Sequence, residues 1–294
     1  MTVSSQLLRL DWLSQAKLPV ELEREIFELA AFLHPEIILT LILVARRVQI
    51  WVEPLLYRTL SVHIFVTRPQ IFRLPLRAAA KLLMANPPSL RKHAQHVCFV
   101  QMRQSSVVAD FLSFCGAAVD VACISTTWEH YPDLSLLRTQ PLRRLSFTLR
   151  ALKQLFPWPD PFNGRHAFFS QITHLRILDW IGEWHTWSGL AQMPHLTHVS
   201  SDTISDSALR GVLQHCKLLE VFVFVFAPQF RLHEKVAEQA ARAARFGDSR
   251  VVILVVKDRL SDWESGARGG EDFWVKASGI VKRRLMERKT ALDH

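Results

Sequence analysis

Apolar residues recur at helical spacing near the start of the chain, between residues 17 and 60. Leu22, Ile26, Leu29 and then Phe32 or Leu33 follow one another at intervals of three or four, and charged residues fill the opposite face. This spacing predicts an amphipathic helix. A stretch of roughly 45 residues with so much apolar surface can hardly bury all of it alone. Part of this surface is therefore expected to face another protein or the following domain.

Prolines mark where the helices of this stretch begin and end. Pro19 suits a first helical position, where its missing N–H would have no partner in any case. His34 and Pro35 end that helix, because the residue before a proline avoids the α region. The apolar run Ile37 to Ala45 predicts a second, more buried helix, and a segment that contains Trp51 closes a compact helical unit.

After residue 60, short apolar runs recur that predict strands. Written as L-x-x-L-x-L with any apolar residue at L, the runs start at Ala94, Val119, Leu142, Ile172, Leu196 and Leu219, and a last strand-like run covers 251–256. Successive starts are 25, 23, 30, 24, 23 and 32 residues apart. These intervals lie at and slightly above the period of leucine-rich repeats.

Helical patterns separate these strands, which predicts an α/β repeat fold. Helices are expected over 76–84, 107–114, 206–213 and 231–246. A strand and its return helix cannot bury their apolar face alone, so they are expected to stack into a solenoid whose parallel sheet is buried on one side and exposed on its concave side. The run VFVFVF at 221–226 instead suits a strand covered on both faces. A doubly wound α/β domain remains the alternative, although the sequence contains neither G-x-G-x-x-G nor G-x-x-x-x-G-K-[ST].

The chain after residue 258 predicts a terminal helix. Phe273, Trp274 and Ala277 lie near one stripe, with acidic residues before them and basic residues after them, as the helix dipole favours. We expect this helix to cap the open end of the repeat stack. A nuclear-localisation signal in KRRLMERK is the other interpretation. The expected domains are therefore a helical unit at 1–60, a solenoid at 61–258 and a cap at 259–294.

Composition and charge argue against a nucleic-acid-binding, membrane-spanning or secreted protein. The formal net charge is +9, but the basic clusters are small and are not interleaved with aromatic residues, so nucleic acid is not an expected partner. No apolar run reaches the 18 residues of a membrane span, and the first residues lack a signal-peptide pattern. The four cysteines show neither C-x-x-C nor zinc spacing, which favours free thiols in a reducing cytosol or nucleus.

Catalytic motifs are missing from the sequence. There is no G-x-S-x-G, no H-E-x-x-H and no paired-carboxylate motif, so we expect no enzyme and no cofactor. His195 and His198 would need further ligands to hold a metal, and no metal site is expected. Trp180, Trp184 and Trp187 lie on a predicted loop. They form either a contact surface for a target protein or packing against neighbouring repeats.

The helical unit resembles the F-box, in the F-box-like form common in mushroom-forming fungi. The matching residues are Leu18, Pro19, Glu21, Leu22, Ile26 and Phe27 for LPxELxxxIF, Val44, Ala45, Arg46 and Arg47 for the V-x-R-x core, and Pro54, Leu56 and Tyr57 for the closing P-x-L-W. Val48 and Tyr57 stand where most F-boxes carry Trp. The strand region resembles the leucine-rich repeats that follow the F-box in many F-box proteins, although the repeats of this chain are degenerate and have mostly lost the usual Asn or Cys positions.

The resemblance implies a role in ubiquitin ligation. The unit would dock on a Skp-family adaptor and so recruit a cullin, while the repeats hold an unknown target protein. By resemblance to the family's adaptor-facing positions, the expected contacts are Leu18, Pro19, Glu21, Ile26, Phe27, Val44, Arg47, Trp51 and Leu56. The protein would then be a non-enzymatic substrate adaptor in the cytoplasm or nucleus. The alternative is a repeat scaffold that has kept the F-box shape and no longer binds the ligase.

Overall fold

The computed structural model describes residues 18–64, 72–85, 88–102, 105–124, 137, 140–148, 163–178, 182–228 and 232–292. The chain divides into two compact units, Met1–Leu56 and Tyr57–His294. In the described part of the chain, none of the helices combines the length and the apolar character that a membrane span requires.

The first unit is helical. It contains α1 (Val20–Leu33), the 3-10 turn η2 (Pro35–Ile37), α2 (Ile38–Leu41) and α3 (Arg46–Arg58), the last of which runs on past the unit boundary. Pro19 is the N-cap of α1 rather than its first helical residue, and His34 is the C-cap, where the sequence predicted the end of the helix.

The second helix of this unit differs from the expectation. The apolar run from Ile37 to Ala45 predicted a more buried helix, but α2 covers only four residues, of which Ile38 alone is buried. Leu43 and Val44, beyond its end, are exposed. Burial was therefore wrongly predicted from apolar composition, because a unit of this size has too little interior to cover every apolar side chain.

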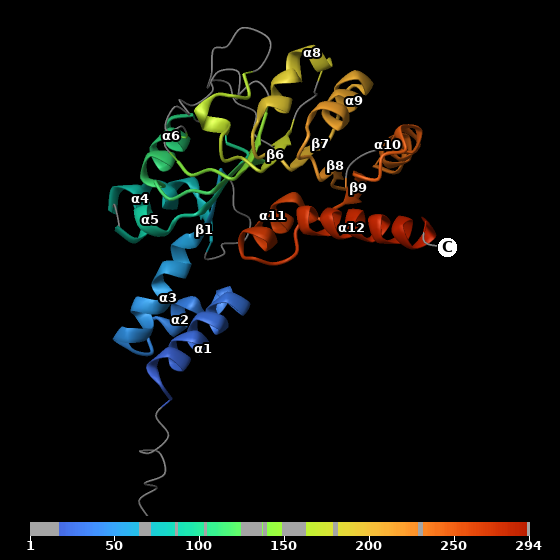
Figure 1. The fold of residues 1–294 in the computed structure, drawn as a ribbon. Coiled ribbons are helices and arrows are strands. Elements are labelled where there is room, and N and C mark those ends of the chain that lie inside the picture. The colour runs from blue at the N-terminus through green and yellow to red at the C-terminus, as the bar shows by residue number, and fades with distance from the viewer. Residues whose placement is uncertain are drawn as a thin grey trace, which may run out of the picture. The chain divides into compact units, whose positions relative to one another are not determined.

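The second unit is built on a nine-stranded, all-parallel sheet with the order β2-β1-β3-β4-β5-β6-β7-β8-β9 (Figure 1). The strands are β1 (Thr59–His63), β2 (Arg73–Pro75), β3 (His96–Val100), β4 (Asp120–Ile124), β5 (Arg144–Phe147), β6 (His174–Ile177), β7 (His198–Ser201), β8 (Val221–Phe226) and β9 (Val251–Val255). Each of the predicted apolar runs forms one of the strands β3 to β9. The sequence did not predict β1 and β2.

Helices cover one face of this sheet. They are α4 (Leu76–Ala85), α5 (Pro88–His93), α6 (Ser105–Phe114), η4 (Ala167–Phe169), α8 (Trp184–Trp187), η5 (Ser188–Gln192), α9 (Asp206–His215) and α10 (Leu232–Phe246). The main core lies between this layer and the sheet, and Phe99, Phe147 and Phe224 are fully buried in it. Successive residues of a strand point to opposite faces of the sheet, so the residues that alternate with these aromatic residues form the other face.

The other face carries α11 (Arg259–Ala267) and α12 (Phe273–Leu292), which lie opposite the helical layer (Figure 1). Val223 and Val225 of β8 pack against Trp274 and Val281 of α12. The all-apolar run of β8 is thus covered on both faces, as predicted. The expected cap over the open end of the stack and the expected exposed concave side are both wrong, because α12 places its apolar stripe on this face instead.

Candidate functional site

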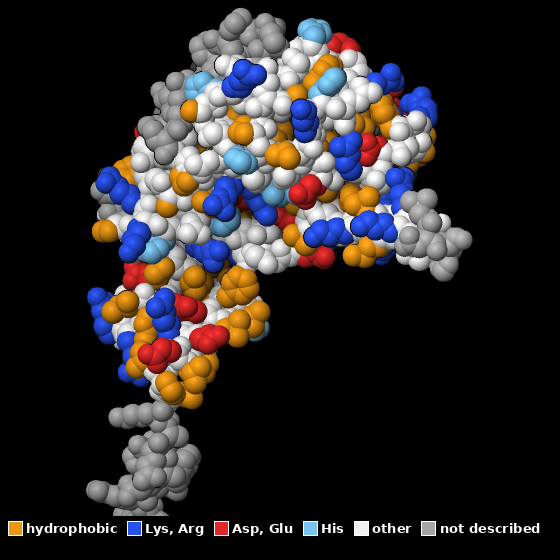
Figure 2. All heavy atoms as spheres, in the orientation of Figure 1, with side chains coloured by type: hydrophobic (Ala, Val, Ile, Leu, Met, Phe, Trp, Pro, Cys, Tyr) orange, Lys and Arg blue, Asp and Glu red, His pale blue; other side chains and the backbone are white. Residues whose placement is uncertain are grey.

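Exposed apolar side chains gather over the helices of the first unit (Figure 2). On α1, Leu22, Ile26, Leu29 and Leu33 are spaced by four, three and four positions, which places them on one helix face. Each of them is between 47% and 60% exposed. These four residues form the apolar stripe of α1.

Further large apolar residues of this unit are also exposed. Leu18 and Val20 lie at the start of α1, and Leu43, Val44 and Ile50 lie between α2 and the middle of α3. Monomeric proteins rarely leave this much contiguous apolar surface in water unless it binds something. The first unit therefore has the surface chemistry of a docking site.

An ion pair fixes α3 against α1 beside this surface. The Arg47 side chain donates from Nη2 to Glu23 Oε1 at 2.7 Å and from Nε to both carboxylate oxygens at 3.1 Å. Glu23 accordingly raises the pKa of Arg47. A bidentate pair of this kind sets orientation as well as distance, so it defines how the two helices present their outer faces.

The residues expected to contact the adaptor fall into two groups. Leu18, Pro19, Glu21, Ile26, Val44 and Arg47 are exposed, and Phe27, Trp51 and Leu56 are half-buried. Val48, which stands where most F-boxes carry Trp, is fully buried. The Val48 side chain therefore belongs to the interior of the unit and is not part of its exposed surface.

The expected tryptophan surface is divided in the structure. Trp187 is fully buried in the main core, so packing, and not target contact, accounts for it. Trp184 is half-buried and stacks on His215 at 5.5 Å. A Cβ atom at Gly211 would lie 2.0 Å from the Trp184 ring, so the glycine makes room for the indole. Trp180 lies outside the described residues.

On the second face of the sheet, a row of side chains that crosses the strands changes from polar to apolar. One row, paired in register from β1 to β7, consists of Thr59, His96, Asp120, Arg144, His174 and His198. At β8 this row continues with Val221. This row is thus polar from β1 to β7 and apolar at β8, whereas Cys98, Ala122 and Ile124 on the same face form an apolar cluster with Leu260 of α11.

Ion pairs join the polar strands to the C-terminal segment. Arg73 of β2 contacts Glu264 of α11 at 2.7 Å, and Arg144 of β5 contacts Asp272 at 3.0 Å. At the far end, Arg284 of α12 donates to the backbone carbonyl of Val251 at 2.7 Å. Residues 259–292 therefore span the sheet from β2 to β9.

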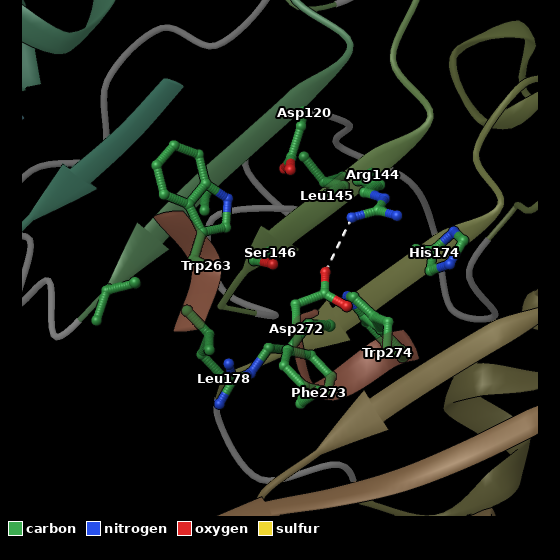
Figure 3. A pocket seen from close by; sticks show the side chains of 13 residues that line it. Asp120, Arg144, Leu145, Ser146, His174, Leu178, Trp263, Asp272, Phe273 and Trp274 are labelled. Carbon is green, nitrogen blue, oxygen red and sulfur yellow. Dashed lines mark hydrogen bonds and ion pairs between the residues drawn. The ribbon is translucent and has the colours of Figure 1, made fainter. Parts of the chain in front are cut away.

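A small cavity remains between the sheet and this segment, bordered by Asp120, Arg144 and Trp263 (Figure 3). Its volume is about 20 Å³, which is room for about one water molecule. Within the described residues, Nε of Arg176 and Nε1 of Trp263 are buried without a hydrogen-bond partner. A bridging water can satisfy such atoms, but an organic substrate cannot fit.

Two histidines of the polar row stack on each other at 4.1 Å, with Trp274 edge-on to both. Burial, followed by the neighbouring His198 and Arg144, lowers the pKa of His174 to about 2, and burial, followed by Arg144 and Lys282, lowers the pKa of His198 to about 4. Both ring nitrogens of His198 are engaged, by Thr197 at 2.8 Å and by Ser278 at 2.9 Å. These imidazoles are structural neutral groups rather than free bases.

Thiol and metal chemistry find little support in the described residues. All four cysteines are buried and unpaired. Burial raises the pKa of Cys115 and of Cys216 to about 12, so their reactive thiolate forms are scarce near neutral pH. Within the described residues, histidine, cysteine and acidic side chains do not gather in groups of three or more that could hold a metal ion.

Comparisons with protein-family models, with curated proteins and with solved structures found no match for this chain. Its surface must therefore be interpreted from its own geometry and from the F-box resemblance of residues 18–57.

The polar row on the sheet is the feature that sequence reasoning missed. Its members stand at or next to the starts of the predicted strands, where they resemble ordinary turn residues. Glu264 and Asp272 gave no sequence signal for this row, because their burial against it arises only when the C-terminal segment folds onto the sheet.

Proposed function

We propose that the protein is a substrate-recognition adaptor of a Skp–cullin–F-box ubiquitin ligase, and that its first unit binds the Skp-family adaptor. The observation that carries this proposal is the exposed apolar stripe of α1. Ile26 belongs both to that stripe and to the LPxELxxxIF pattern, and Leu22 does as well. A surface of this kind, next to the Glu23–Arg47 pair, suits a protein partner with an apolar groove.

We further infer that the second unit is a degenerate leucine-rich-repeat solenoid. From β3 to β9 the strand order follows the chain, and the connecting helices share one face of the sheet. A doubly wound domain would reverse its strand order near the middle and would place connecting helices on both faces. The intervals of 23 to 32 residues between strand starts support the same assignment.

The target protein would bind the second unit elsewhere than on the face of the sheet that residues 259–292 occupy. The protein itself breaks and forms no bonds. It tethers a lysine-bearing target close to a charged ubiquitin carrier, so that transfer proceeds at high effective concentration. This role belongs to the cytoplasm or the nucleus.

Binding of the full chain to a purified fungal Skp-family adaptor, measured by calorimetry, tests the proposal. The variant Ile26→Asp places a charge in the stripe and should weaken binding about thirtyfold or more. Leu218→Asp is the matched control, because Leu218 in the second unit has the same exposed fraction, 53%, as Ile26. If the natural chain does not bind at micromolar concentration, or if both variants bind equally, the adaptor proposal is wrong and a repeat scaffold remains.

A further inference from the structure

The sheet ends at β9, which has a strand neighbour on one side only. Within the described residues β9 pairs with β8 and with no further strand. The strand is VVILV, and Val255 is 52% exposed. Natural proteins usually protect an edge strand with charged residues, proline or a bulge, and β9 contains neither a charged residue nor proline.

Hydrogen bonds show which backbone groups of β9 face the open edge. Phe222 donates its N–H to the carbonyl of Arg250 at 3.0 Å, and Val256 donates to the carbonyl of Phe226 at 2.8 Å. The even-numbered residues of this strand therefore direct their backbone groups to β8. Because direction alternates along a strand, the odd-numbered residues direct theirs outward.

Among the outward residues that the structure describes, only Val251 has hydrogen-bond partners for both its backbone N–H and its carbonyl group. Val251 donates to the carbonyl of Asp248 at 3.1 Å and accepts from Arg284 at 2.7 Å. No comparable bond is made at this edge by Ile253 or Val255 within the part of the chain that the structure describes. Two consecutive outward positions are thus available to pair with another extended chain.

An open groove lies between α10 and α12, beside the part of this edge formed by Val251 and Ile253. Its lining consists of Ala240, Ala243, Ala244, Gly247, Asp248, Ser249, Val251, Ile253, Arg284 and Arg288. The volume is about 420 Å³, within the range of about 300–1,000 Å³ that holds ligands in proteins.

The two walls of the groove differ in chemistry. The α10 wall consists of small apolar residues, Ala240, Ala243 and Ala244, and the α12 wall carries Arg284 and Arg288. These helices lie on opposite faces of the sheet (Figure 1). Successive side chains of an added strand would also point to opposite faces. One set would meet the alanines, and the other set would meet the guanidinium group of Arg288, because Arg284 already donates to the carbonyl groups of Ser249 and Val251. The carboxylate of Asp248 also lines the groove and interacts with Arg288.

We propose that an extended peptide with alternating apolar and acidic residues adds a tenth strand to the sheet along β9. Its backbone pairs with Ile253 and Val255, its apolar side chains face α10, and its carboxylates face Arg288. A second copy of this chain is a poorer occupant, because edge-to-edge pairing would bring the arginines of both copies together in a chain of net charge +9. Naming this peptide a ligase target rests on the proposed function, whereas the strand addition does not.

Fluorescence anisotropy with the full chain and a labelled synthetic peptide tests the site. The probe is a peptide of about eight residues that alternates valine and glutamate, long enough for a typical strand. The matched peptides replace glutamate by lysine, or replace two central valines by proline. The valine–glutamate peptide should bind at least about tenfold more tightly than either, since only it offers both carboxylates and a complete backbone.

Variants of the protein locate the binding. Ile253→Pro deletes one outward N–H, and Arg288→Glu reverses the charge of one wall, so each should weaken binding about tenfold or more. Lys289→Glu makes the same charge change on the same helix, outside the groove lining, and should change binding less than about twofold. Arg288 is exposed, so its variant should fold even if Ile253→Pro does not.

Three results would overturn the strand addition. Equal losses in Arg288→Glu and Lys289→Glu would indicate general electrostatic attraction. Self-association in sedimentation that Arg288→Glu changes would make a second copy the occupant. Absence of peptide binding by a chain that still captures the Skp-family adaptor would remove this site and leave the proposed function standing. In the supporting case, Ile26→Asp loses the adaptor and keeps the peptide.

Discussion

The two units of this protein differ in how much of their apolar side-chain surface they bury. Among the residues that the structure describes, 17 large apolar residues have exposed side chains, and 11 of these lie between residues 18 and 50, in the first unit. The second unit instead buries both faces of its sheet, one under a helical layer and the other under residues 259–292. The comparison teaches that apolar patterning alone does not decide burial. The decisive factor is whether the chain supplies a second layer to cover the first.

The largest expected difference between the units is in stability. Phe224→Ala in the second unit removes a fully buried aromatic ring and should lower the free energy of unfolding by about 3–5 kcal/mol. Urea unfolding of the full chain, followed by circular dichroism, measures this value. A loss below about 1 kcal/mol would mean that the core around β8 is loosely packed.

Acid should weaken the second unit through its stacked histidines. The unfolded chain takes up protons at both imidazoles below about pH 6.5, whereas folded His174 and His198 stay neutral down to pKa values of about 2 and 4. Stability should therefore fall as the pH drops from about 6.5, by about 1–2 kcal/mol for each imidazole between pH 7 and pH 5. The measurement is urea unfolding at these two pH values.

The matched variant for this test is His174→Gln combined with His198→Gln. It should lose most of the difference between pH 7 and pH 5. If its stability falls with acid as much as that of the natural chain, groups other than the stacked imidazoles control the response.

Removing one ion pair that holds residues 259–292 on the sheet should have a smaller effect on stability. Glu264→Gln removes the charge that pairs with Arg73 and should lower the free energy of unfolding by about 2 kcal/mol. The segment itself should become more accessible, so limited proteolysis within residues 259–292 should accelerate. Glu271→Gln, an exposed change nearby, is the control. Equal cleavage rates for the two variants would show that this ion pair does not hold the segment.

The smallest effect is expected in the first unit. Leu29→Ala truncates a residue of the apolar stripe that is 54% exposed, and the free energy of unfolding should change by no more than about 0.5 kcal/mol. The same change should still reduce affinity for the Skp-family adaptor under the proposed function. A stability loss comparable to that of Phe224→Ala would mean that the stripe packs internally, and the contrast between the units would disappear.

Much of the fold could be predicted from the sequence, because periodicity is a local signal. Leu145 and Phe147 lie on the buried side of β5, Leu142 is buried directly before the strand, and runs with the same spacing recur from β3 to β9. The start of β1 lies directly after a helix that ends at Arg58, so the change of period there falls within a few residues. A strand as short as β1, directly after a helix, cannot be distinguished from that helix by its pattern of apolar residues alone.

The candidate sites were harder to predict, because they depend on contacts between distant residues. Ile26 was assigned to the exposed surface through family resemblance, and periodicity alone would have placed it in a core. Glu264 meets Arg73 across 191 positions of sequence, and no local pattern encodes that contact. The groove at β9 depends on alanines and arginines from two helices that join only when the sheet is complete.

The covering of the sheet by residues 259–292 also has a consequence for synthesis on the ribosome. Arg73 precedes Glu264 by 191 residues, and at about 5–20 residues per second their translation is separated by roughly 10–40 s. During this interval Cys98, Ala122 and Val223 of the nascent sheet lack the apolar residues that cover them in the folded protein. A chain that ended before residue 259 would leave that face permanently uncovered, so truncation there should expose this apolar surface to chaperones and to aggregation.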